Sequence, residues 1–124
     1  MQILKLSMVA ALFILSFFLA LPGVSQGHAF PDHSDPKVGA TVSASPANVR
    51  IWFDGDLEPV FSTIIVQDAG GKRIDKGNGR VNPADVRLLE IGLPPLRSGS
   101  YRVVWNVVAR DGHRTAGDYI FVIK

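Results

Sequence analysis

The segment YRVVWNVVARDGH, residues 101–113, decides the fold of this chain. Every second residue from Tyr101 to Val107 is aromatic or valine, so these side chains share one face of an extended chain. Valines also occur on the other face, and aromatic and β-branched residues at this density favour a largely buried β-strand. The segment therefore predicts a central strand of a β-rich domain.

The same segment ends in a polar stretch that contains Asp111, Gly112 and His113. If the chain stays extended there, Asp111 and His113 leave on the same side, because they are two residues apart. A carboxylate and an imidazole would then converge just beyond a rigid strand. A solvated turn bent at Gly112 explains the same residues, so this stretch alone leaves both interpretations open.

Short apolar segments on both sides of this strand have the same β character. Turn-forming residues separate them, and we find no convincing run of helical period. Together they predict an all-β fold of about seven antiparallel strands, a small Greek-key β-barrel or sandwich of immunoglobulin-like or cupredoxin-like appearance. The predicted strands are Val38–Val42, Val49–Phe53, Phe61–Gln67, Lys72–Ile74, Val86–Ile91, Tyr101–Val108 and Ala116–Ile123.

The first 27 residues predict a cleaved signal peptide, residues 1–27, rather than part of this domain. A single lysine is the only charged residue before His28, and Ser7–Leu21 is an almost wholly apolar run. A membrane anchor is the alternative, but a span needs about 20 apolar residues and this run is shorter. We therefore expect a periplasmic protein cut after Gly27, or less favourably after Ser25, with one mature domain over residues 28–124.

The composition of the predicted mature chain excludes several classes of protein. Without the signal peptide it has 12 basic and 11 acidic residues, and this near-neutral balance argues against binding to nucleic acid. The chain has no cysteine, so no disulfide supports the fold and no thiolate can bind a metal.

The three histidines, His28, His33 and His113, indicate a metal site. Cleavage after Gly27 makes His28 the first residue, and its α-amine and imidazole Nδ1 would then close a six-membered chelate ring on a metal. A nitrogen of His113 and an oxygen of Asp111 complete three nitrogens and one oxygen, a set that Cu(II) prefers and that suits tetrahedral zinc less well. The sequence therefore predicts one Cu(II) ion per chain at His28, Asp111 and His113. Both methionines precede His28, so a soft Cu(I) site is not expected.

These features resemble the CopC-type periplasmic copper-binding proteins over essentially the whole predicted mature chain. The resemblance implies a Greek-key β-barrel or sandwich, copper homeostasis and resistance rather than an enzymatic activity, and Cu(II) ligands at His28, Asp111 and His113. It also implies that copper passes to an inner-membrane CopD-type transport partner. The matching features are His28 at the mature terminus, Pro36 with Gly39, FDGDLEP at Phe53–Pro59, GSYRVVW at Gly99–Trp105, and VVARDGH at Val107–His113 followed by Gly117.

The chain departs from that family in two ways. Many members carry a methionine-rich loop for Cu(I), which is missing here, so the chain resembles the Cu(II)-only branch. In some members a glutamate of the first acidic loop, which is Asp54–Pro59 in this chain, approaches the copper. The matching place here is about Gly55, so a contribution from Asp54 or Asp56 stays open. For His33, a solvated loop histidine is favoured over an auxiliary ligand.

Two other classes of protein remain as alternatives. An N-terminal histidine with a second histidine also suits a copper oxygenase, but a small domain offers little surface for a polymer substrate. Asp111 would also occupy a copper position that oxygen chemistry needs open. A metal-free immunoglobulin-like adhesion or assembly module is the other alternative, and its activity would not depend on His28.

Overall fold

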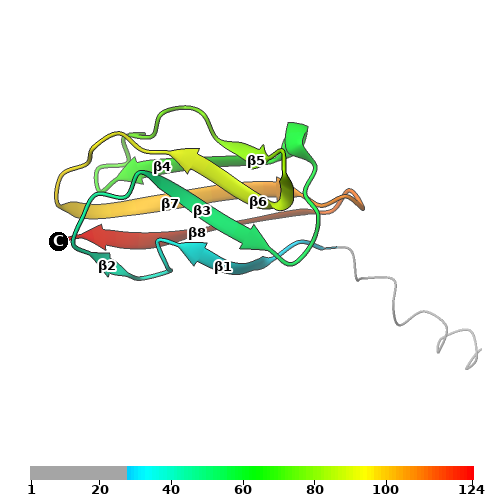
Figure 1. Ribbon diagram of the computed structural model, residues 1–124, viewed down its shortest axis with the longest axis horizontal. Coiled ribbons are helices and arrows are strands. Elements are labelled where there is room, and N and C mark those ends of the chain that lie inside the picture. The colour runs from blue at the N-terminus through cyan, green and yellow to red at the C-terminus, as the bar shows by residue number, and fades with distance from the viewer. Residues whose placement is uncertain (1–27) are drawn as a thin grey trace, which may run out of the picture.

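Eight β-strands and one 3-10 turn make up residues 28–124, the part of the chain that the computed structural model describes. The predicted signal peptide lies outside these residues. The first sheet has the strand order β1-β3-β6-β5 and the second β2-β8-β7-β4, and the two sheets form two layers (Figure 1). The elements are β1 (Pro31–Asp35), β2 (Thr41–Val42), β3 (Asn48–Phe53), η1 (Pro59–Phe61), β4 (Thr63–Asp68), β5 (Arg80–Asn82), β6 (Asp85–Gly92), β7 (Gly99–Val108) and β8 (Arg114–Ile123).

The predicted all-β sandwich is confirmed, with differences in its shortest strands. β1 and β5 form where an arm and a turn were expected, because strands this short give little alternation to recognise. β2 pairs with β8 in parallel, whereas the strands were expected to be antiparallel. The segment after the turn at residues 68–71 forms only an isolated bridge between Gln67 and Arg73. Within the described range, no helix is long and apolar enough to cross a membrane.

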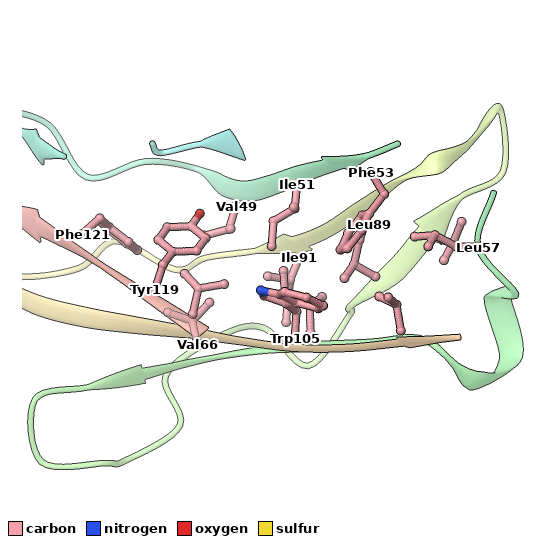
Figure 2. Packing of buried hydrophobic residues seen from close by; sticks show 14 of the residues in the cluster. Val49, Ile51, Phe53, Leu57, Val66, Leu89, Ile91, Trp105, Tyr119 and Phe121 are labelled. Atoms are coloured by element: carbon pink, nitrogen blue, oxygen red, sulfur yellow. The ribbon is translucent and has the colours of Figure 1, made fainter. Parts of the chain in front are cut away.

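The apolar face predicted for β7 forms the centre of the core. Tyr101, Val103, Trp105 and Val107 are at most 8% exposed, as the alternation indicates. Figure 2 shows Trp105 packed between the sheets, together with Ile51 and other side chains of the facing sheet. Burial of one large apolar side chain contributes roughly 1.5–3 kcal/mol, so this face holds β7 firmly in place.

The β7–β8 hairpin carries this rigidity to one end of the molecule. Its strands pair without a break from Gly99 opposite Ile123 to Val108 opposite Arg114. Gly117 faces Trp105 in this ladder, and a Cβ atom at Gly117 would lie only 2.5 Å from the indole ring, so only glycine fits there. The tip of the hairpin and the beginning of the described chain lie at the same end of the sandwich (Figure 1).

Candidate metal centre

The turn between β7 and β8 is a hydrogen-bonded loop rather than a continuation of the strand. Ala109 N donates to His113 O over 2.9 Å, and Gly112 N donates to Ala109 O over 2.9 Å. Gly112 has a φ of 90°, a conformation that L side chains rarely adopt. Asp111 Oδ1 accepts a hydrogen bond of 3.0 Å from the His113 backbone amide. Asp111 and His113 therefore converge through a turn bent at Gly112, the alternative that the sequence left open, and not through an extended chain.

A second hydrogen bond joins the two side chains of this turn. His113 Nδ1 and Asp111 Oδ2 are 2.7 Å apart. The hydrogen bonds from the His113 side chain and backbone lower the pKa of Asp111 below its ordinary value of 3.8, and the charges of His113 and His28 act in the same direction. An ionised carboxylate only accepts hydrogen bonds, so Nδ1 carries the proton. Nε2 is then the nitrogen of His113 that can bind a metal, the usual arrangement for a histidine oriented by a carboxylate.

The arm before β1 brings His28 to this turn. The imidazole rings of His28 and His113 meet edge to face, with centroids 4.4 Å apart and an interplanar angle of 90°. The ring of Phe30 approaches His28 in the same manner at 6.0 Å. His28 and Asp111 also line an open cavity of about 460 Å³ at this end of the sandwich. The structure thus places two predicted nitrogen ligands, from opposite ends of the described chain, side by side.

The aspartates of the first acidic loop border the same cavity but have protein partners. Asp54 Oδ1 accepts a hydrogen bond of 2.8 Å from Phe30 N, and the Asp54 amide donates to Phe30 O over 2.9 Å. The Asp56 carboxylate binds Arg87 Nε at 3.0 Å and lies 3.3 Å from the guanidinium of Arg110. These contacts give Asp54 and Asp56 structural functions, which the sequence did not distinguish from metal binding.

His33 lies on β1, away from the two paired imidazoles. Its ring stacks on Trp52 with centroids 4.5 Å apart and an interplanar angle of 9°, and its Nδ1 is 2.8 Å from Asp32 Oδ2. The side chain is 60% exposed, so it is solvated as expected, although it belongs to a strand and not to a loop. Alternation on β3 directs the half-buried Trp52 to the outer face of the sheet, where it covers His33.

Side chains alone provide a small donor set at this site. Among residues 28–124, no three His, Asp or Glu side chains are arranged so as to hold a metal ion together. His28 contacts His113, and Asp111 contacts His113, through the ring stacking and the hydrogen bond described above. The backbone nitrogen of His28 is an amide in the full-length chain and becomes an amine only after cleavage at Gly27.

Comparison with known proteins identifies the family. The CopC domain matches residues 32–124, which include both sheets and the Asp111–His113 turn, so the chain belongs to the CopC family. Protein YobA of Escherichia coli K12 is 34% identical over 115 residues, which are 92% of each chain. The copper transport protein CutJ of Bacillus subtilis is 31% identical over 111 residues, which are 89% of this chain but 20% of that protein.

A solved structure supports the same assignment. The crystal structure of CopC from Methylosinus trichosporium OB3b superposes with a TM-score of 0.70 at 34% identity, covering 78% of this chain and 94% of that chain. The predicted resemblance to CopC-type copper-binding proteins and the predicted sandwich are therefore confirmed. Copper resistance proteins are among the matches, and CopC proteins are copper-binding resistance proteins rather than enzymes, in agreement with the sequence-based expectation.

Proposed function

We propose that this protein binds one Cu(II) ion at His28, Asp111 and His113 in the periplasm and passes it to an inner-membrane transport partner of the CopD type. The contact between the His28 and His113 rings carries this proposal. Two imidazoles that meet at 4.4 Å, beside a carboxylate whose pKa is lowered, provide nitrogen and oxygen donors at one place. Cu(II) favours such a set of donors.

Each residue has a definite function in this proposal. His28 supplies the α-amine and Nδ1 as a chelate, and His113 supplies Nε2, because its Nδ1 is engaged by Asp111. The two oxygens of Asp111 accept two hydrogen bonds from His113, and a carboxylate has about four lone-pair sites. In the arrangement that the structure shows, Asp111 orients His113 from the Nδ1 side of the ring. To offer an oxygen to a copper ion at Nε2 as well, the Asp111 carboxylate has to turn away from Nδ1 when copper binds. The three nitrogens and one oxygen suit a tetragonal Cu(II) centre.

The oxidation state follows from the types of donor that the sequence provides. Cu(I) selects soft thiolate and thioether ligands. The chain contains no cysteine, and Met1 and Met8 both precede the predicted mature terminus. We therefore expect Cu(II) to bind much more tightly than Cu(I).

Export and transfer follow from the predicted signal peptide and from one relative. The apolar run before His28 supports export to the periplasm, where the free amine would exist. The part of CutJ that matches this chain is one fifth of a longer copper transport protein. The same domain thus occurs within a larger transport protein, which supports a separate membrane partner for the present chain.

The decisive experiment changes the position of the amine while keeping every side chain. The mature protein beginning at His28 is compared with a form that has one extra residue before His28, by Cu(II) competition titration. The extended form should bind Cu(II) much more weakly, because the amine and Nδ1 no longer belong to the same residue. Equal affinity of both forms would refute the chelate. The intact mass of periplasmic protein shows independently whether cleavage follows Gly27.

A further inference from the structure

The arm that carries His28 needs to be held in place for the proposed site to exist. Chain termini are poorly ordered unless they are tied down, and cleavage after Gly27 would make His28 a terminus. The next residue, Ala29, is fully buried, so the arm is already attached one residue after the proposed ligand. The hydrogen bonds around Ala29 therefore decide how well His28 is positioned.

The two sheets hold this arm from opposite sides. On the side of the first sheet, Phe30 and Asp54, which follows β3, exchange two hydrogen bonds of 2.8 and 2.9 Å. On the side of the second sheet, Thr115 Oγ1 donates a hydrogen bond of 2.6 Å to the carbonyl oxygen of Ala29. Asp54 thus attaches the arm to the first sheet, and Thr115 attaches it to the second.

The place of Thr115 in β8 gives its hydrogen bond a particular consequence. Thr115 lies two residues after His113 and pairs with Val107 in the rigid β7–β8 ladder. Its hydroxyl therefore connects the arm that bears His28 directly to the hairpin that bears Asp111 and His113. The Asp54 contacts provide no such connection, because Asp54 belongs to the other sheet.

We propose that Thr115 is a positioning residue that fixes the distance between the two halves of the copper site. This inference rests on the proposed function of His28 and His113. Without the Thr115 hydroxyl, the arm spends part of its time away from the hairpin, and apparent affinity falls in proportion to the fraction of molecules that can bind. The carbonyl of the buried Ala29 also loses its partner, which favours displacement of the arm.

Two substitutions at one position separate this function from strand stability. Thr115→Val keeps the β-branched shape and removes the hydroxyl, whereas Thr115→Ser keeps the hydroxyl and removes a methyl group. Strand propensity favours valine over serine. Positioning of the arm favours serine over valine, so the two explanations predict opposite rankings. Thr63→Val, at an exposed threonine of β4, is the matched control for the change of residue type.

We expect Thr115→Val to weaken Cu(II) binding about 3- to 10-fold, the range that corresponds to one hydrogen bond, while Thr115→Ser and Thr63→Val bind like the native protein. The electron paramagnetic resonance spectrum of Cu(II)-loaded Thr115→Val should contain a second copper species that lacks the His28 chelate. Binding that is weaker in Thr115→Ser than in Thr115→Val would overturn the proposal.

Hydrogen exchange of the Phe30 amide gives a test that does not depend on copper. This amide donates to Asp54 only while the arm is docked, so it should exchange faster in metal-free Thr115→Val, with core amides of β7 unchanged. Unchanged exchange, or faster exchange without weaker copper binding, would overturn the positioning function and leave the proposed function intact. If the native protein failed to bind Cu(II), the proposed function would fall, and Phe30 exchange would still show whether Thr115 holds the arm.

Discussion

Two pairs of aromatic rings lie toward opposite ends of the β7–β8 hairpin, and they contribute to the molecule in different ways. Toward one end, Tyr101 stacks on Phe121 with centroids 5.6 Å apart, and both residues are buried. At the other end, His28 meets His113 at 4.4 Å, and the His113 side chain is 57% exposed. The first pair is held by apolar burial, whereas the second is held by hydrogen bonds of the arm and the turn.

This difference teaches how stability and function are divided in the domain. Removal of a ring from the buried pair opens a cavity and costs folding free energy. Removal of a ring from the exposed pair costs little folding free energy, but it removes a nitrogen donor. Changes at the two ends of one hairpin should therefore affect different measurements: the free energy of unfolding at the buried pair and Cu(II) affinity at the exposed pair.

The largest effect on stability is expected for Phe121→Ala. Phe121 is fully buried, so its truncation should lower the free energy of unfolding by about 3–5 kcal/mol. Urea denaturation of the metal-free protein measures this loss. Phe61→Ala is the matched control, because Phe61 is 59% exposed and its loss should change stability by less than about 0.5 kcal/mol. Similar losses in both variants would show that the buried rings are not what stabilises the fold.

At the exposed pair, His113→Ala should weaken copper binding strongly and leave the stability of the fold nearly unchanged. It removes a proposed nitrogen ligand, so Cu(II) affinity should fall by more than the roughly 10–100-fold that typically follows loss of a partner that orients a ligand. Stability of the metal-free protein should change by less than about 0.5 kcal/mol. Competition titration and urea denaturation measure the two quantities. An unfolded His113→Ala protein would show that the exposed pair also supports the fold.

Asp111→Asn should have a smaller effect on copper binding than His113→Ala. The amide keeps a hydrogen-bonding side chain and leaves three nitrogens in place, but it removes the charge that orients His113. We expect a loss of Cu(II) affinity within the roughly 10–100-fold range. Competition titration under identical conditions gives the ranking, and a greater loss for Asp111→Asn than for His113→Ala would contradict the assigned functions.

Sequence patterns captured the parts of the molecule that depend on neighbouring residues. The apolar alternation of Tyr101–Val107 predicted the buried face of β7. For Asp111 and His113 the sequence left an extended chain and a turn at Gly112 both open, and the two side chains meet through the turn. The contact of Thr115 with Ala29 spans 86 positions, and no local pattern indicates it. Asp54 was recognised only as a carboxylate near the site, because its partner Phe30 is brought to it by the pairing of β1 with β3.

Tyr119, a buried residue of β8, should make the stability of the fold depend on alkaline pH. Burial raises the pKa of Tyr119 from 10.0 to about 12, and its hydroxyl donates to Pro36 O over 2.9 Å. The folded state holds this proton more tightly, so the associated stability is fully present below pH 10 and is lost as pH rises through 12. Tyr119→Phe should be less stable than the native protein near neutral pH by about 0.5–1.5 kcal/mol, for the lost hydrogen bond. Urea denaturation across this pH range should show the difference shrinking, and a constant difference would exclude Tyr119 as its source.

The smallest effect on copper binding is expected for the third histidine, His33. Its ring pair with Trp52 lies on the first sheet and not on the β7–β8 hairpin, so it tests the comparison from outside. His33 stacks on Trp52 on the outer face of the first sheet, while the proposed copper donors gather around His113. His33→Ala should therefore leave Cu(II) affinity unchanged. It should lower the free energy of unfolding by no more than about 0.5–1.5 kcal/mol, the contribution typical of an aromatic pair and an upper bound here, because the His33 side chain is 60% exposed. The two measurements together separate the possibilities: a large loss of copper binding with normal stability would mean that His33, and not the exposed pair of the hairpin, supplies a ligand.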